Sequence, residues 1–117
     1  MEFDFIFLGK AYKARIVTAN YRSNGAIYIG IETFDEEYQE WESWCDVTTN
    51  LNWFSYDENT ITIKNERYVE YDKSLIQYLT EFGIIEKKIL EFIPQGYNFY
   101  DCYLVNVTKL KELAVAL

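Results

Sequence analysis

The stretch "EFDFIFLGKAYKARIVTA", residues 2–19, decides the fold class because it reads as two β-strands joined by a tight turn. Phe3, Phe5 and Phe7 occupy every second position of residues 2–8, which places them on one face of a strand. A glycine turn at residues 9–10 follows, and alternation resumes over residues 11–19. The pattern predicts an antiparallel hairpin.

The same pattern continues along the chain to residue 51. Asn24-Gly25 is a strong turn signal, and it precedes a strand-like run over residues 26–34. The acidic connection "DEEYQE", residues 35–40, leads to a further strand predicted over residues 41–51. Residues 2–51 are therefore predicted to form a meander of about four antiparallel strands. Gly30 lies inside one of them, which indicates a bulge or a close contact.

The second half mixes strands with two helices. Strands are predicted at residues 60–64, at 87–93 up to Pro94, and at 97–107, while residues 65–71 extend or pair with the first of these. A helix is expected over residues 72–83, with Asp72 as N-cap and Gly83 at its end. Its apolar stripe consists of Leu75, Ile76, Leu79 and Phe82.

A last helix is expected over residues 108–117, capped by Thr108 and facing inward through Leu110, Leu113 and Ala114. We therefore predict an α+β fold: a mainly antiparallel β-sheet, built from the N-terminal meander and C-terminal strands, with two helices packed on one face. A length of 117 residues is typical of one domain, so a single domain is expected over residues 1–117.

Composition narrows the function class. The chain has a net charge of −8 and no histidine, which removes the commonest general base and the usual zinc ligands. Carboxylate-pair catalysis and magnesium binding stay open, but the carboxylates gather at a predicted hairpin tip, where no cleft would raise an acid's pKa. We expect no enzyme activity, no metal and no cofactor.

Location and association are also predicted. No apolar run approaches the roughly 20 residues of a membrane helix, and the N-terminus lacks the pattern of a signal peptide. We expect a cytoplasmic protein, without membrane attachment, that is a monomer or a small homo-oligomer. Cys45 and Cys102 are expected to be free thiols, with a disulfide as the alternative if their strands are neighbours.

The segment "IETFDEEYQEWESW", residues 31–44, is the candidate functional site. Six of its fourteen residues are acidic and four are aromatic, and no Lys or Arg occurs between Arg22 and Lys64. Exposed Tyr and Trp are favoured at interface hot spots. The predicted partner-binding residues are Asp35, Glu36, Glu37, Tyr38, Glu40, Trp41, Glu42, Asp57 and Glu58.

Three structural alternatives stand beside this prediction. The acidic loop could serve only solubility. Trp41 and Trp44 could fold back onto the sheet, as Phe34, like Phe5 and Ile29, is expected to join the core. The aromatic strand at residues 97–107 resembles an RNA-binding surface, but Asp101 lies beside its rings where such sheets carry Lys or Arg, so coverage of both faces is the preferred interpretation.

The chain resembles an uncharacterised family, a domain of unknown function found in small acidic proteins of bacterial conjugative elements, plasmids and phages. The residues that carry the resemblance are "FLGKAYKARIV", "ETFDEEYQEWESW", "VTTNL", "LTEFGI" and "YDCYLVNVTKLKEL". The resemblance implies a mobile genetic element, where small acidic proteins often inhibit host defence.

Two functions follow as hypotheses. In the first, the protein inhibits a host nucleic-acid-handling defence enzyme, most specifically as an anti-CRISPR protein that blocks guide RNA or DNA binding. Its carboxylates would act as a nucleic-acid mimic toward a basic nucleic-acid-binding protein such as a CRISPR effector nuclease, with no direct nucleic-acid binding by the chain itself. In the alternative, it is an accessory or regulatory interaction protein of a conjugative element or phage, without a role in defence.

Overall fold

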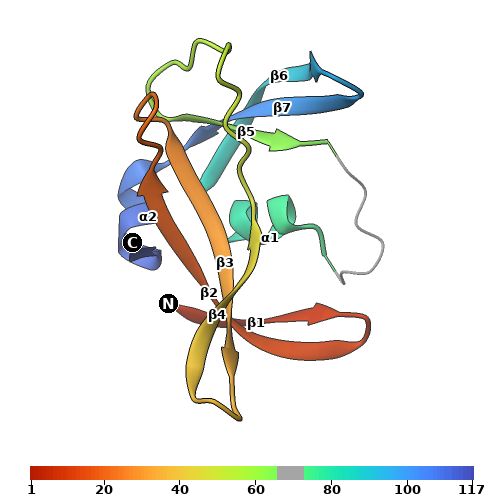
Figure 1. Ribbon diagram of the computed structural model, residues 1–117, viewed down its shortest axis with the longest axis vertical. Helices are drawn as coiled ribbons and strands as arrows, with labels where there is room; N and C mark the ends of the chain where they lie inside the picture. The colour runs from red at the N-terminus through yellow and green to blue at the C-terminus, as the bar shows by residue number, and fades with distance from the viewer. Residues whose placement is uncertain (66–72) are drawn as a thin grey trace.

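Two antiparallel sheets and two short helices make up the computed structural model, which describes residues 1–65 and 73–117 (Figure 1). The larger sheet has the order β1 (Glu2–Phe7), β2 (Lys10–Asn20), β3 (Ile27–Asp35), β4 (Glu40–Asp46), with β8 (Val115–Ala116) parallel to β2. The smaller sheet has β7 (Asn98–Val105) between β5 (Thr60–Lys64) and β6 (Ile85–Gln95). The helices are α1 (Leu75–Glu81) and α2 (Val107–Leu113). The predicted α+β class and the four-strand meander are confirmed.

The first hairpin forms as the alternating pattern predicts. Phe7 pairs with Lys10 across a two-residue turn, and both turn residues have positive φ, 52° at Leu8 and 74° at Gly9. Such turns match the twist of the flanking strands. Phe5 is fully buried, and Phe3 and Phe7 pack at the edge of the same core.

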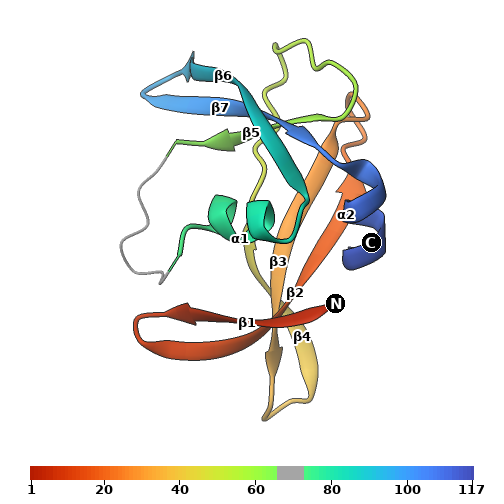
Figure 2. The same cartoon turned by 180° about the vertical axis from the view of Figure 1, so that it is seen from behind.

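The strand β2 changes partner along its length. Residues 10–15 pair with β1, whereas residues 14–20 pair with β3, and Ala14–Thr33 is the first pair of that second ladder. The β1–β2 and β3–β4 hairpins therefore diverge, as both ribbon views show (Figures 1 and 2). The β3–β4 hairpin projects along the longest dimension of the molecule, which measures 42 × 29 × 24 Å.

The strand β4 ends at Asp46, so the prediction of a strand up to residue 51 is wrong. The Ile29 carbonyl accepts hydrogen bonds from the amides of both Val47 and Thr48, which turns the chain out of the ladder. The Thr49 amide then donates to the Thr62 carbonyl in β5. Residues 47–51 thus connect the two sheets instead of extending the first.

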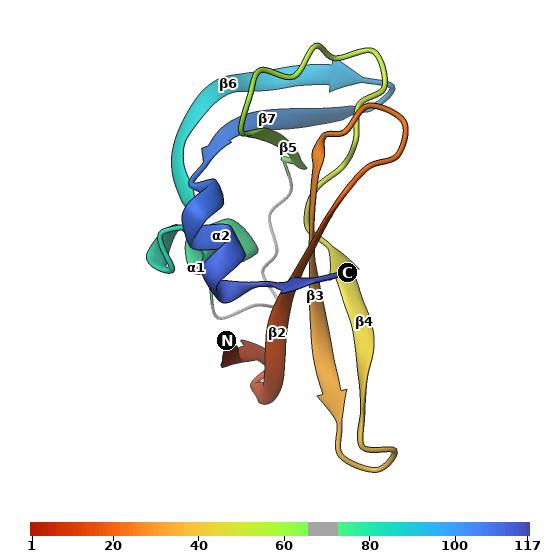
Figure 3. The ribbon, with the colours of Figure 1, turned by 90° about the vertical axis from the view of Figure 1, so that its left-hand side faces the viewer.

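One core joins both sheets and both helices. It includes Ile16 and Ile31 from the larger sheet, Ile61 and Tyr103 from the smaller one, and Leu79 from α1. The helices lie on the same side of β2 and β3 (Figure 3). Within the described part of the chain, neither helix is long and apolar enough to cross a membrane.

Phe34 does not join this core, contrary to prediction. Ile29, Ile31 and Thr33 alternate inward along β3, so Phe34 lies on the opposite face, half-buried against Trp41. On that outer face the Tyr28 phenol lies over Gly30, so closely that a Cβ at residue 30 would overlap it. The predicted close contact at Gly30 is confirmed.

Both helices begin at other residues than expected. Ser74 caps α1 by accepting the Gln77 amide, and the proposed cap Asp72 lies outside the described residues, as does most of the segment 65–71. Asn106, rather than Thr108, caps α2 by accepting the Lys109 amide. That helix ends at Leu113, because the chain turns extended at Ala114 and adds β8 to β2.

The strand β6 continues past Pro94, which pairs with Phe99. A proline is compatible with this place because β6 is an edge strand and needs no amide donor on its free side. The neighbouring strand β7 buries Tyr100, Asp101, Cys102 and Tyr103. Both faces of β7 are therefore covered over residues 100–103, while Asn98 and Phe99 at its start are exposed. Partial coverage of both faces, the preferred interpretation of this aromatic strand, is confirmed.

Candidate partner-binding surface

The tip of the β3–β4 hairpin is held by its own polar groups. The Asp35 Oδ1 atom accepts hydrogen bonds from the amides of Glu37, at 2.9 Å, and Tyr38, at 3.2 Å. The Gln39 side-chain amide donates to the Glu36 carbonyl at 2.6 Å. We call residues 35–42 the acidic hairpin. Asp35 has a structural role within it, because its carboxylate closes the turn.

The carboxylates of the acidic hairpin crowd one another. Glu36, Glu37, Glu40 and Glu42 are exposed, and Asp35 pairs with Glu40 across the strands. The pKa of the Glu42 carboxyl is raised, first by its hydrogen bond to the Asp35 carboxyl and then by the negative charge of Asp35. The fold of the free protein thus holds these carboxylates close enough to repel one another, and a nearby cation would reduce that repulsion.

Trp41 folds back onto the sheet. Its ring lies under the guanidinium of Arg15, 4.3 Å from carbon to ring centroid, and meets Phe34 edge-on at 5.3 Å. The same guanidinium binds the Glu32 carboxylate at 2.7 Å. One face of the Trp41 ring is therefore already occupied, which agrees with the alternative that it folds back onto the sheet. Its role in partner binding stays a prediction.

The other two aromatic residues of segment 31–44, Trp44 and Tyr38, lie in different environments. Trp44 packs edge-on against Phe5 and Phe7 and lies 4.9 Å from Tyr12, between ring centroids, so it belongs to the core side. Tyr38 lies at the tip with 69% of its surface exposed. Tyr38 is thus the aromatic side chain of the acidic hairpin that a partner could reach without rearrangement.

A groove of about 470 Å³ separates the acidic hairpin from the β1–β2 hairpin. One wall carries Asp35, Glu36, Glu37 and Glu42, and the other carries Lys10 and Lys13. Each lysine is also 5.0 Å from a ring centroid, Lys10 over Tyr12 and Lys13 over Phe34. Lys10 and Lys13 therefore offset part of the negative charge of the acidic hairpin on this side.

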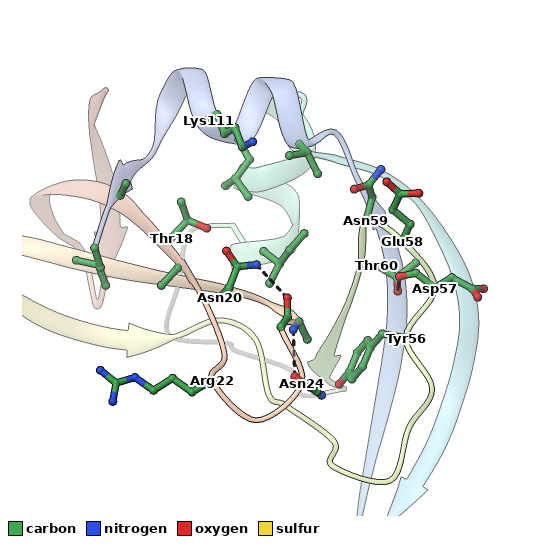
Figure 4. A pocket seen from close by; sticks show the side chains of 18 residues that line it. Thr18, Asn20, Arg22, Asn24, Tyr56, Asp57, Glu58, Asn59, Thr60 and Lys111 are labelled. Atoms are coloured by element: carbon green, nitrogen blue, oxygen red, sulfur yellow. Dashed lines mark hydrogen bonds between the residues drawn. The ribbon is translucent and has the colours of Figure 1, made fainter.

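Asp57 and Glu58 lie at the other end of the molecule. They line a pocket of about 800 Å³ formed by the β2–β3 turn, the loop before β5, and α2 (Figure 4). Arg22 and Lys111 line the same pocket and offset their charge. The structure therefore brings seven of the nine predicted residues together in the acidic hairpin and places these two elsewhere.

No sequence pattern indicated that Arg15, Lys10 and Lys13 of β2 lie beside the acidic hairpin, and Glu32 was predicted only as part of the acidic segment 31–44. Arg15 pairs with Glu32 across the β2–β3 ladder. A two-residue Asn24-Gly25 turn would instead have placed Arg15 opposite Phe34, but the connection spans residues 21–26 and is closed by the bond from the Tyr21 amide to the Ala26 carbonyl. The Arg15–Glu32 pair could have been found only from the register of the β2–β3 ladder, and that register depends on this longer turn.

The chain matches no family model, no curated protein and no solved structure. The resemblance to a family of mobile elements thus stays a prediction. Within residues 1–65 and 73–117, no group of three or more Asp, Glu or Cys side chains is placed to hold a metal ion.

Proposed function

We propose that the protein is an acidic inhibitor that inserts its β3–β4 hairpin into the basic groove of a nucleic-acid-handling defence enzyme. The observation that best supports this is a cluster of five carboxylates on a projecting hairpin that is stiffened at its base by Arg15 and Trp41. An RNA-guided nuclease is the most specific candidate, because its nucleic-acid channel is strongly positive. Such a partner would place the protein in the cytoplasm of a bacterial host.

The crowding of Asp35 and Glu42 supports a cationic partner. An Arg or Lys side chain placed between the two carboxylates would favour their charged forms and so lower the raised pKa of Glu42. Part of the binding free energy would then come from relief of a repulsion that the free protein carries. A purely solubilising surface would gain nothing from such crowding.

The position of the charges supports competition with nucleic acid. Same-face residues such as Glu40 and Glu42 lie about 7 Å apart along a strand, and residues on the two strands face one another. A two-stranded ribbon is slim enough to enter the roughly 12 Å wide major groove of DNA, so it is narrower than the duplex that such a protein groove accommodates. The hairpin would occupy the Arg and Lys side chains that otherwise contact phosphates.

The test is a salt series of binding to a purified RNA-guided nuclease, with and without its guide RNA. Two variants change the net charge equally: Glu36→Lys/Glu37→Lys in the acidic hairpin, and Asp57→Lys/Glu58→Lys at the far pocket. We expect the affinity to fall steeply as the salt concentration rises, and binding to be weaker when the guide RNA is loaded. Only the Glu36→Lys/Glu37→Lys variant should lose binding. The proposal would be ruled out if the affinity depended neither on salt concentration nor on loaded guide RNA, or if both variants weakened binding equally.

A further inference from the structure

The strand β6 is exposed to an unusual degree. It is an edge strand, and residues 86–92 are exposed on both faces. Among them are the apolar side chains of Ile89, Leu90 and Phe92. An edge strand with uncovered apolar residues on this scale marks an interaction surface.

Further aromatic rings gather at the end of the same hairpin. Phe99 meets Phe92 edge-on at 6.2 Å, and Tyr97 in the turn is fully exposed. Trp53 joins them from the loop before β5, because its indole nitrogen donates to the Gln95 side chain at 2.6 Å. We call these six residues the apolar end: Trp53, Ile89, Leu90, Phe92, Tyr97 and Phe99.

Phe92 is held outward at a local energetic cost. Its φ is 55°, a conformation that a bulky residue rarely adopts, and 60% of its surface is exposed. The buried Asp101 carboxylate fixes this geometry by accepting the Phe92 amide at 3.1 Å. Asp101 in turn accepts a hydrogen bond from the Asn65 side chain and pairs with Lys88 at 3.5 Å. A strained backbone that presents an exposed ring indicates function rather than folding.

We propose that the apolar end is the interface of a homodimer, in which two copies pack ring against ring. The six exposed side chains offer on the order of 600 Å² per copy, since aromatic side chains bury about 150–250 Å² each. Two copies together would bury about 1,200 Å², the lower end of the roughly 1,200–2,000 Å² of specific interfaces. The two copies would not pair their β6 strands in one continuous ladder, because register shifts and Pro94 interrupt the edge of β6.

The charge distribution favours a second copy as the occupant. Residues 61–117 contain eight acidic and seven basic side chains, whereas residues 1–60 contain eleven and four. The β6–β7 hairpin, which carries five of the six residues of the apolar end, belongs to the nearly neutral part and lies at the opposite end of the long axis from the acidic hairpin (Figure 3). Packing there keeps the two most acidic regions as far apart as the molecule allows, and leaves both free for partners.

Sedimentation velocity over a wide concentration range tests the proposal. We expect wild type to reach twice the chain mass of 14.0 kDa, with self-association that salt does not weaken, since the interface is apolar. Phe92→Asn/Tyr97→Ser should raise the dimer dissociation constant about tenfold or more, because aromatic residues dominate interface energies. Asn tolerates positive φ, so the variant should fold, as its melting curve would show.

The matched control is Leu8→Asn. Leu8 is also apolar, 71% exposed and at positive φ, but it belongs to the β1–β2 turn. It should leave self-association unchanged. A wild type that stays monomeric at every concentration, or a dimer that Phe92→Asn/Tyr97→Ser leaves intact, would overturn the inference. Neither result depends on the nuclease experiment, so the two proposals can fail separately.

Discussion

The Arg15 guanidinium stacks on the Trp41 ring at 4.3 Å while it binds Glu32, so one side chain of β2 contacts both strands of the projecting hairpin. Because the β2–β3 ladder begins at Ala14–Thr33, this contact lies where the hairpin leaves the sheet. Among the described residues, no third strand pairs with the hairpin beyond this contact, so the Arg15–Trp41 pair supports the hairpin at its base.

The Arg15–Trp41 contact should be measurable as a coupling energy. A double-mutant cycle with Arg15→Ala and Trp41→Ala should give about 0.5–1 kcal/mol of interaction free energy in urea unfolding. Arg15→Lys should recover only part of it, because an ammonium cannot lie flat on the ring. Additive single effects would show that the stacking contributes nothing to stability.

The glutamates of the acidic hairpin should matter little to folding. Glu36→Lys, Glu37→Lys and Glu40→Lys together should leave the melting temperature within a few degrees, since exposed substitutions usually change stability by under about 0.5 kcal/mol each. Asp35→Ala, in contrast, should lower it, because the amides of Glu37 and Tyr38 lose their acceptor. A triple variant that unfolds would make these residues structural.

Tyr38 and the carboxylates should affect different rates of partner binding. Tyr38→Ala should raise the dissociation rate and leave the salt dependence unchanged, because a packed ring acts after encounter. Glu36→Lys/Glu37→Lys should lower the association rate and reduce the salt dependence. Surface-binding kinetics at several salt concentrations measure both, and a Tyr38→Ala effect confined to association would contradict this division.

The pH dependence of stability should reveal the Asp35–Glu42 pair. The pKa of Glu42 is raised in the folded protein by its hydrogen bond to Asp35 and by the charge of Asp35, so the folded state holds this proton more tightly than the unfolded chain does. This contribution to stability is present at low pH and is lost as pH rises through the folded pKa. Glu42→Gln should therefore flatten the melting temperature against pH in the acidic range. An identical profile for wild type and Glu42→Gln would contradict a raised pKa of Glu42 in the folded protein.

Both thiols should be unreactive in the native protein. Cys45 and Cys102 are free, burial raises the pKa of Cys45 to about 11, and burial likewise raises that of Cys102. Since the thiolate is the reactive form, a thiol reagent at pH 8 should label neither until denaturant is added. Labelling of folded protein at the rate of free cysteine would contradict the structure.

Sequence patterns predicted the strands better than their ends. Alternation suffices for β1 and β2, because one face of each must be buried. Alternation could not show that the Ile29 carbonyl would accept hydrogen bonds from the amides of Val47 and Thr48, which end β4. The end of α2 was equally hidden, because "AVAL" has good helix formers and only the free edge of β2 makes a strand preferable.

The acidic hairpin was predictable as a segment but not as a surface. Charge density and aromatic content indicated residues 31–44, which include seven of the nine predicted partner-binding residues. The stacking of Arg15 on Trp41 depends on strand register. The distance of Asp57 and Glu58 from the acidic hairpin depends on residues 47–51, which cross from one sheet to the other. Both are long-range features that no local pattern contains.

The acidic hairpin places five carboxylates at one end of the 42 Å axis, which gives the molecule a permanent electric dipole. A positively charged object at a distance of one or two Debye lengths would turn the protein before touching it, tip first. Productive collisions would then be a larger share of all collisions than random tumbling allows. The same torque would act on an anion-exchange resin, where the chain should be retained more strongly than its net charge of −8 alone would imply.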